Sequence, residues 1–211
     1  MLKPTEAAVV ARVALRDINR VIDEHILPDA FFSLSDGRTI AMSACPLIGF
    51  YFDSATRLTA EERLFAIRQI APRLHVLPAR MSAALIAEDW IVRDEFLTID
   101  LNPFVKRAHE RMDRLTAARD LVIFDPEILG GAPVVRGTRI PVHDVAASIA
   151  AGLSTERILA AYPSLDANKL ELAALYAEAT PARGRPRSSN VLPTSAVVIA
   201  DRRIARRSKS A

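Results

Sequence analysis

Residues 103–120, PFVKRAHERMDRLTAARD, predict a long helix that sets the organisation of the whole chain. A proline at the first helical position is favourable, because the N–H that it lacks would have no intrahelical partner there. One narrow apolar stripe at helical spacing is formed by Phe104, Ala108, Met112 and Leu115. Most other positions are charged, so we predict a strut between two folded units, with solvent on most of its surface.

The composition favours a mainly helical fold around this strut. Hydrophobic residues make up 50% of the 211 positions but aromatic residues only 6%, so the core is expected to be aliphatic and rich in alanine. This length allows one large domain or two small ones with a tail. We therefore predict a mainly α fold with small β-hairpins, in which two helical units are followed by an extended tail.

A connector region is predicted over residues 53–120, with the strut at its end. Thr59-Ala60-Glu61-Glu62 has the pattern of a capping box, and the helix after it is expected to end near Ile70, before Pro72. Two strands, 89–93 and 96–100, are predicted on either side of a turn at Asp94-Glu95.

The first 52 residues predict two short helices joined by a tight turn. Thr5 is the expected N-cap of the first helix, and Val9 and Val10 are expected to face inward. The second helix is expected over roughly residues 15–25. Its inward stripe would consist of Leu15, Ile18, Val21 and Ile22.

A β-hairpin is predicted next, because two alternating runs in residues 31–42, FFSLSDGRTIAM, flank a turn that contains Gly37. Two helices followed by a hairpin is the order of a winged helix. With residues 23–28, DEHILP, at the end of the second helix, the segment resembles the N-terminal half of MerR-like DNA-binding domains. The alternative is a solvated amphipathic helix with no nucleic-acid role.

A winged helix would contact DNA with long polar side chains from its second helix and its hairpin. The whole chain has a net charge of +3, but residues 1–180 alone have a net charge of −4. A negative body argues against non-specific DNA binding, so contacts to DNA would come from local basic patches. The predicted DNA-binding residues are Arg12, Arg16, Asn19, Arg20 and Arg38.

A second helical unit is predicted over residues 121–180. It would begin with a short buried strand at 121–124, and its helices have clear boundary signals. Gly152 is expected to end the first helix, and Ser154 and Asp166 are expected to cap the two that follow. The three helices, which again suggest a helix–turn–helix-like unit, are predicted at 142–151, 155–161 and 167–179.

The stretch that enters this unit, residues 130–142 (GGAPVVRGTRIPV), does not have the spacing of a nucleotide-binding loop. Gly130 and Gly131 are expected to adopt positive φ, and the residues around Gly137 to form a turn before a helix. Arg136 and Arg139 would point outward. Their role stays open between a DNA phosphate, a dimer partner and a purely shaped turn.

No catalytic, metal or cofactor site is predicted. The histidines His25, His75, His109 and His143 lack metal-ligand spacing. The carboxylates Asp89, Asp94, Glu95 and Asp100 could mimic a nuclease site, but charges that bound exposed strands are the ordinary case. One cysteine, Cys45, cannot form an internal disulfide, and no apolar run reaches the roughly 18 residues of a membrane span. We expect a cytoplasmic protein that is neither an enzyme nor a membrane protein.

The last segment, residues 181–211, carries eight basic residues and one acidic residue. Its proline-, arginine- and serine-rich start predicts disorder. It also contains one apolar run, Ala196 to Ala200, that is long enough for a strand. A basic tail of this kind suits a polyanion or an acidic protein surface.

Residues of the second unit resemble the bacterial "domain of unknown function 433" family over about 60 residues. The matching runs are 125–131, 133–142, 151–154, 158–159 and 162–165. Members are generally antitoxins encoded beside a toxin with a PIN-like ribonuclease fold. With its MerR-like start and residues 97–103, LTIDLNP, the chain is similar to VapB-type antitoxins of actinobacteria. The resemblance implies that it inhibits a cognate toxin and represses its own operon. Two helix–turn–helix-like units in one chain suit operator binding, particularly as a homodimer on a palindrome.

The tail then becomes the expected toxin-binding segment. Its apolar run would add a strand to the edge of the toxin's sheet. Its arginines would neutralise the carboxylate cluster of the toxin's active site. The predicted toxin-binding residues are Val197, Val198, Ile199, Arg202, Arg203, Arg206 and Arg207. Two alternatives remain: a transcriptional regulator without a toxin partner, and an enzyme or nuclease that uses Asp89, Asp94 or Asp100.

Overall fold

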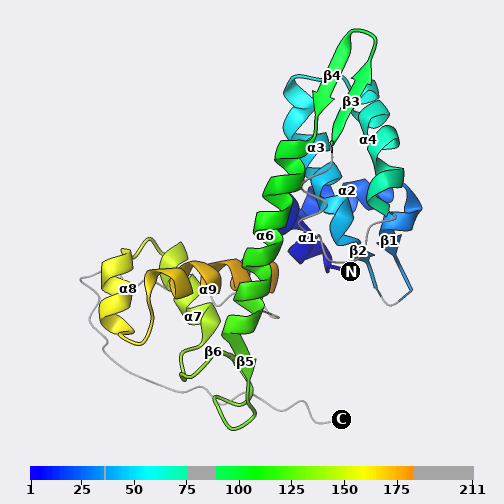
Figure 1. Cartoon of the computed structure of the whole chain (residues 1–211). Helices are drawn as coiled ribbons and strands as arrows, with labels where there is room; N and C mark the ends of the chain where they lie inside the picture. Colours follow the sequence, from blue (N-terminus) through cyan, green and yellow to red (C-terminus); the bar gives the residue numbers. More distant parts are fainter. Residues whose placement is uncertain (36, 76–88, 183–211) are drawn as a thin grey trace, which may run out of the picture.

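A computed structural model describes residues 1–35, 37–75 and 89–182. The fold is mainly helical with small antiparallel strand pairs, as predicted (Figure 1). The helices of the first part are α1 (Pro4–Ala11), α2 (Leu15–Asp23), α3 (Cys45–Asp53) and α4 (Ala60–His75). Its strands are β1 (Phe32–Ser33), β2 (Thr39–Ile40), β3 (Ile91–Asp94) and β4 (Leu97–Asp100). Short 3₁₀ helices are η1 (Asp29–Phe31), η2 (Met42–Ala44) and η3 (Ser54–Thr56).

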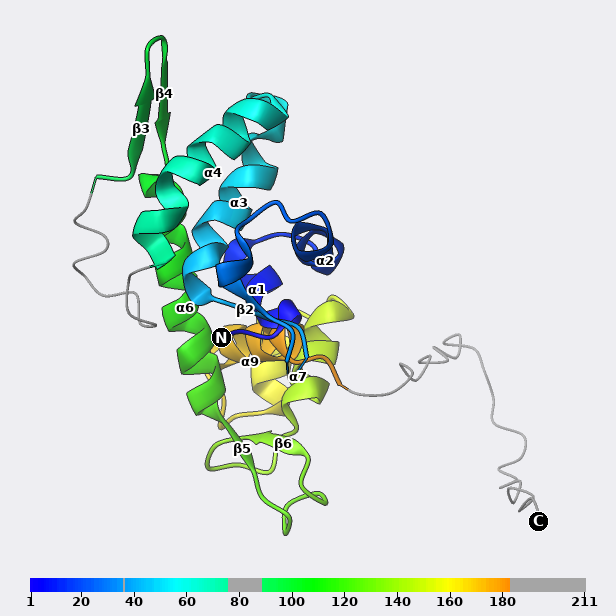
Figure 2. The same cartoon turned by 90° about the vertical axis from the view of Figure 1, so that its right-hand side faces the viewer.

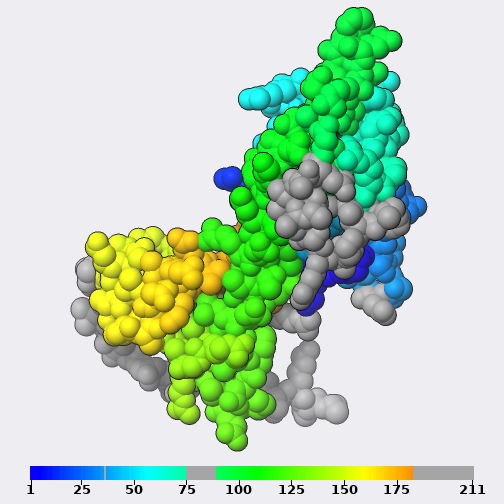
Figure 3. All heavy atoms as spheres, in the orientation of Figure 1, coloured from blue at the N-terminus to red at the C-terminus, as the bar shows by residue number. Residues whose placement is uncertain are grey.

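The long helix α6 (Asn102–Leu121) joins this part to the rest of the described chain. Beyond it lie β5 (Val122–Phe124), β6 (Pro133–Val135), α7 (Val142–Ala150), α8 (Thr155–Ala161) and α9 (Ala167–Ala179). Figures 1 and 2 show α6 running between the two groups of elements, and Figure 3 shows part of its side open at the surface. None of the described helices combines the length and the apolar character that crossing a membrane requires.

Helix α6 buries a wider face than its sequence predicts. Ala108 and Leu115 are buried, and Phe104 and Met112 are partly buried, but Val105 and Ala118 are buried as well. The reason is that α6 packs against α1, α3 and α9, which come from both sides of it in the sequence. The strut therefore joins the core along one face, while half of its residues stay exposed to solvent, as predicted for the rest of its surface.

Helix α1 is enclosed, and its N-cap prediction was wrong. The cap residue is Lys3, and the Thr5 hydroxyl instead donates to the Ala179 carbonyl oxygen at 2.6 Å. Glu6 accepts a hydrogen bond from the Lys3 backbone N–H at 2.8 Å and pairs with Arg119 of α6 at 2.7 Å. The Glu6 side chain is only 11% exposed whereas that of Arg119 is 39% exposed, so this ion pair joins α1 to α6 at the edge of the core.

The predicted second helix and the hairpin after it are both present, although their ends differ from the prediction. Ile18, Val21 and Ile22 are buried, whereas Leu15 stays 43% exposed. The helix ends at Asp23, two residues before the expected end. Strands β1 and β2 pair antiparallel, with Phe32 opposite Ile40 and Ser33 opposite Thr39.

The capping box before α4 is confirmed, but the predicted end of this helix was wrong. The Thr59 N–H donates to Glu62 at 2.7 Å, and the Glu62 N–H donates to the Thr59 hydroxyl at 3.3 Å. The helix then continues through Pro72 to His75. Proline costs about 3 kcal/mol inside a helix. Packing offsets this cost, since a continuous face of α4 is buried on both sides of Pro72 at Ile67, Ile70, Ala71 and Leu74.

The boundary signals in the second part of the chain are confirmed. The Ser154 hydroxyl accepts from the Arg157 N–H at 3.3 Å, and the Asp166 carboxylate accepts from the Lys169 N–H at 2.8 Å. Gly152 adopts a positive φ of 78° just after α7. The expected strand at 121–124 exists as β5 and pairs antiparallel with β6. The expectation that it is buried was wrong beyond Val122, since Phe124 is 65% exposed at the end of this two-stranded sheet.

Two buried clusters organise the described residues. One contains residues of α1, α2, α3, α4, β3, β4 and α6, together with Ala179 of α9. The other lies among β5, β6, α7, α8 and α9, with Ala118 of α6 as a member. The division into residues 1–52, 53–120, 121–180 and 181–211 stays a prediction, as do the winged-helix and helix–turn–helix assignments.

Candidate nucleic-acid interface and an arginine-lined pocket

Four of the five predicted DNA-binding residues belong to α2 or to the hairpin beside it. Because Ile18, Val21 and Ile22 are buried, the opposite side of α2 presents its polar residues outward. Arg38 of the hairpin pairs with Asp23 of α2 at 2.9 Å and donates to the Asn19 side chain at 3.4 Å. The α2–hairpin surface, as we name it, consists of Arg16, Asn19, Arg20 and Arg38.

The charges of the α2–hairpin surface are balanced by neighbouring carboxylates. Arg20 pairs with Glu24 at 2.9 Å, and Arg16 lies 3.8 Å from Asp17. The hydrogen bond and the attraction from Glu24 raise the pKa of Arg20 above its ordinary value. These pairs are exposed to solvent, so they stabilise the fold only weakly. The arginines are held in defined positions, but weakly enough to exchange partners.

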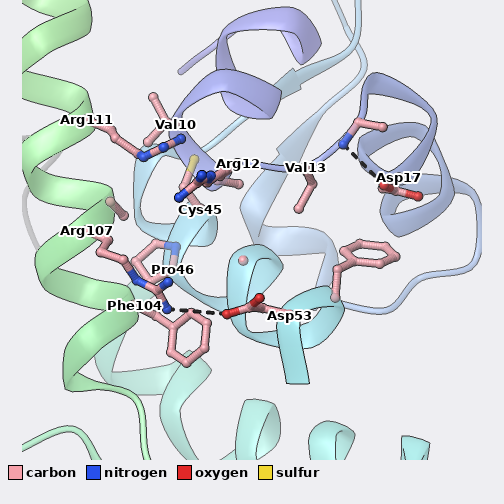
Figure 4. Close-up of a pocket in the computed structure, with 15 residues that line it drawn as sticks. Val10, Arg12, Val13, Asp17, Cys45, Pro46, Asp53, Phe104, Arg107 and Arg111 are labelled. Atoms are coloured by element: carbon pink, nitrogen blue, oxygen red, sulfur yellow. Dashed lines mark hydrogen bonds and ion pairs between the residues drawn. The ribbon is translucent and has the colours of Figure 1, made fainter. Parts of the chain in front are cut away.

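The fifth residue, Arg12, lies at a different place. It is the C-cap of α1 in the left-handed conformation, with φ 59°. Its side chain lines a pocket between the α1–α2 turn, α3 and α6, together with Arg107 and Arg111 (Figure 4). None of the four residues of the α2–hairpin surface lines this pocket.

This arginine pocket has a volume of about 370 Å³. Arg107 forms an ion pair with Asp53 at 3.5 Å. Its guanidinium carbon also lies over the Phe104 ring, 4.5 Å from the ring centroid. Arg111 donates to the Val9 carbonyl oxygen at 2.9 Å. The pocket depends on the close approach of α3 to α1 at Gly49, where an added Cβ would lie 3.0 Å from the Ala11 carbonyl oxygen.

Several positive charges converge at Arg111. Burial lowers its pKa, and so does repulsion from Arg12, Arg107 and Arg114, whereas Glu178 raises it. Sequence reasoning missed Arg107 and Arg111 because it assigned them to a solvated strut. Their spacing of four residues, which places them on one helix face, is the signal that could have found them.

The stretch at residues 130–142 has the backbone shape that its glycines predict. Gly130, Gly131 and Gly137 all adopt positive φ. Arg136 donates from Nε to the Asp120 carbonyl oxygen at 2.8 Å, and its backbone N–H donates to the Leu121 carbonyl oxygen at 2.7 Å. The first contact of Arg136 is thus structural, since it joins the end of β6 to the end of α6. Arg139 is exposed.

The carboxylates near β3 and β4 are engaged locally. Asp89 pairs with Arg93 at 3.2 Å, and Asp100 accepts hydrogen bonds from Asn102 at 2.8 Å. Over residues 1–35, 37–75 and 89–182, no group of three or more His, Cys, Asp or Glu side chains is placed to hold a metal ion. The predicted toxin-binding residues Val197, Val198, Ile199, Arg202, Arg203, Arg206 and Arg207, and the strand expected at Ala196 to Ala200, lie outside the described residues.

Comparison with known proteins places this architecture in a family. Residues 122–177, which span β5 to α9, match the family described as "Protein of unknown function (DUF433)". The whole chain is similar to the protein named "Uncharacterized protein y4eO" of Sinorhizobium fredii (strain NBRC 101917 / NGR234). The two are 61% identical over 210 residues, which cover 100% of this chain and 95% of that protein. No solved structure matches. The chain therefore belongs to the family of y4eO and carries a DUF433 domain at residues 122–177.

Proposed function

We propose that the protein is the antitoxin of a type II toxin–antitoxin pair, which binds operator DNA as a homodimer and inhibits a PIN-like ribonuclease. The observation that carries the DNA-binding part is the α2–hairpin surface, where Arg38 of the hairpin contacts Asn19 and Asp23 of α2. A helix and a hairpin that share one polar surface suit a winged helix, in which the helix enters the major groove and the hairpin contacts the backbone.

The side chains of this surface have the chemistry that base and phosphate recognition uses. Arg16, Asn19 and Arg20 occur at i, i+3 and i+4, so they project from neighbouring positions of one helix face. Asparagine reads adenine and arginine reads guanine through paired hydrogen bonds in the major groove. The buried residues of α2 fix the direction of this face relative to the hairpin.

The carboxylates beside these arginines give the proposed interface its selectivity. On binding, Arg20 and Arg38 would exchange Glu24 and Asp23 for phosphate oxygens. The ion pairs are exposed and weak, so the exchange costs little. Asp23 and Glu24 would at the same time repel a duplex that offers no matching base contacts, because like charges close together are unfavourable.

The double variant Arg20→Ala/Arg38→Ala tests this interface. We expect it to bind the DNA upstream of its own gene at least about tenfold more weakly, which is about 1.4 kcal/mol. The slope of log K against log salt should become less negative by about 0.9 for each phosphate that the variant no longer neutralises. The measurement is fluorescence anisotropy with labelled duplex at several salt concentrations.

Arg93→Ala is the matched control, since Arg93 of β3 is also an exposed arginine in an ion pair, with Asp89, and lies outside the α2–hairpin surface. It should leave both the affinity and the slope unchanged. If the double variant binds like the wild type, or if Arg93→Ala weakens binding equally, the α2–hairpin surface is not the interface.

The toxin-binding part of the proposal rests on the charge of residues 181–211 and on the resemblance of the DUF433 domain to antitoxins. Eight basic residues against one acidic residue suit the carboxylate cluster that a PIN-like ribonuclease uses to hold Mg²⁺. The balanced charge of the α2–hairpin surface offers no comparable excess. The tail is thus the segment whose chemistry complements such an active site.

Truncation after Ala182 tests toxin binding. We expect the truncated chain to lose the ability to rescue growth when it is co-expressed with the protein of the neighbouring reading frame, while the full chain rescues. Asp201→Ala, which keeps every basic residue of the tail, should rescue like the full chain. Operator binding measured on the same truncated protein shows whether it is folded. Rescue by a folded, truncated chain would contradict the proposal.

A further inference from the structure

One guanidinium at the arginine pocket, that of the solvent-exposed Arg12, has no partner among the described residues. The Arg12 side chain makes no hydrogen bond and no ion pair with any described residue, although its backbone conformation holds it at the pocket. Figure 4 shows the guanidinium groups of Arg12, Arg107 and Arg111 gathered on the side of the pocket next to α6. An arrangement that concentrates like charges costs stability unless an anion joins it.

The carboxylates that line the pocket do not balance these charges. Asp53 is engaged by Arg107 at 3.5 Å. Asp17 accepts from the Ala14 backbone N–H at 3.2 Å and lies 3.8 Å from Arg16. Arg111 donates to a neutral carbonyl oxygen, so it gains a hydrogen bond there but no opposite charge. Among the residues that line this pocket, no carboxylate pairs with Arg12 or Arg111; Glu178, which attracts Arg111, lies outside the lining.

The backbone at Arg12 positions its side chain at the pocket. The residue that adopts the left-handed conformation at the end of a helix is usually glycine, which does so without a steric penalty. Arg12 has φ 59° there instead. Three other non-glycine residues also adopt positive φ, so the conformation alone assigns no role, but here it places at the pocket a guanidinium that makes no hydrogen bond or ion pair with a described residue.

The rest of the lining gives the shape of that partner. Val10, Val13, Pro46, Phe52 and Phe104 provide an apolar part of the wall. A volume of about 370 Å³ lies within the range of small-molecule sites, roughly 300–1,000 Å³. The pocket is open to solvent on one side, so a small molecule can reach it without a change in the packing of α1, α3 and α6.

We propose that the arginine pocket binds a small molecule with an oxyanion head, a phosphate ester or a carboxylate, and a flat apolar body. The head is held between Arg12 and Arg111, and the body lies against Phe52 and Phe104. Guanidinium groups suit both head groups because their parallel N–H donors match two oxygens at once. This site is separate from the α2–hairpin surface and does not rest on the proposed antitoxin function.

Titration calorimetry of the full chain with phenyl phosphate, benzoate, inorganic phosphate and phenol tests the site. We expect phenyl phosphate or benzoate to bind with a Kd below about 1 mM, and the tighter of the two identifies the head. Inorganic phosphate, which lacks the body, should bind at least about tenfold more weakly, and phenol, which lacks the head, should not bind at all.

Arg12→Ala is the decisive variant. It should weaken binding of the preferred probe at least about tenfold. Because the Arg12 side chain has no internal partner, the melting temperature of the free protein should not fall, which separates weaker binding from impaired folding. Arg111→Lys keeps the charge but removes the paired N–H donors, so it should weaken binding of the probe as well. Arg93→Ala is the control and should bind like the wild type.

Three results would overturn the proposal. The first is no binding of phenyl phosphate or benzoate to the wild type up to about 10 mM. The second is equal binding to the wild type and to Arg12→Ala. The third is binding of phenol as tight as that of the charged probes, which would reduce the pocket to an apolar cavity.

Discussion

Replacing Phe50 by alanine is expected to lower the free energy of unfolding by about 3–5 kcal/mol. Phe50 is 2% exposed and lies on α3, where its ring meets the ring of Phe104 on α6 edge to face, 5.5 Å between centroids. The substitution removes the apolar surface, the ring–ring interaction and the packing on one side of α6, and it leaves a cavity. Because α6 contributes to both buried clusters, we expect no local rearrangement to fill it.

Urea unfolding followed by the fluorescence of the one tryptophan, Trp90, measures this loss of stability, since Trp90 is fully buried. The melting temperature should fall by roughly 6–20 °C, at about 2–4 °C per kcal/mol for a chain of this size. Phe96→Ala is the matched control, because Phe96 is 99% exposed at the tip of the β3–β4 hairpin. It should change stability by less than about 0.5 kcal/mol. Equal losses of stability in the two variants would show that α3 does not pack on α6 as described.

Alkaline pH is expected to destabilise the protein through Cys45. Burial raises the pKa of the Cys45 thiol from its ordinary value near 9.0 to about 12. Between these two values the unfolded chain has released a proton that the folded chain retains. The free energy of unfolding therefore falls by about 1.4 kcal/mol per pH unit in this window. The contribution is fully present below about pH 9 and is lost as the pH rises to about 12, in total about 4 kcal/mol.

Urea unfolding of the wild type and of Cys45→Ala at intervals from pH 8 to pH 12 isolates this effect. Tyrosine and lysine titrations occur in both proteins and cancel in the difference between them. At pH 8 the variant should have the lower free energy of unfolding, because its side chain is smaller. The difference in the free energy of unfolding between the two proteins should shrink as the pH rises. Parallel curves would show that the thiol is open to solvent.

Local boundary signals could be predicted from the sequence because their causes lie within a few residues. Thr59 and Glu62 cap each other across one turn, and Asp166 caps α9 through the Lys169 N–H. The hairpin turn at Gly37 needs only the positive φ that glycine allows. In each case the residue type and its immediate neighbours determine the conformation.

Features that depend on distant parts of the chain could not be predicted in this way. Thr5 looks like a cap, but its hydroxyl binds the end of α9. Pro72 looks like a helix end, but buried residues on both sides of it keep α4 continuous. The arginine pocket exists only because α6 packs beside α1, which places Arg107 and Arg111 next to Arg12.

The enclosure of α1 has a consequence for synthesis of the chain. Every residue from Glu6 to Ala11 is buried, and α6 and α9 provide much of the cover. The hydrogen bond between Thr5 and Ala179 spans 174 residues, which a ribosome adds in roughly 9–35 s at about 5–20 residues per second. Throughout that interval the start of the nascent chain exposes an apolar surface that its own later helices have yet to cover. A chaperone that holds this surface until α9 emerges would protect the chain from aggregation during synthesis.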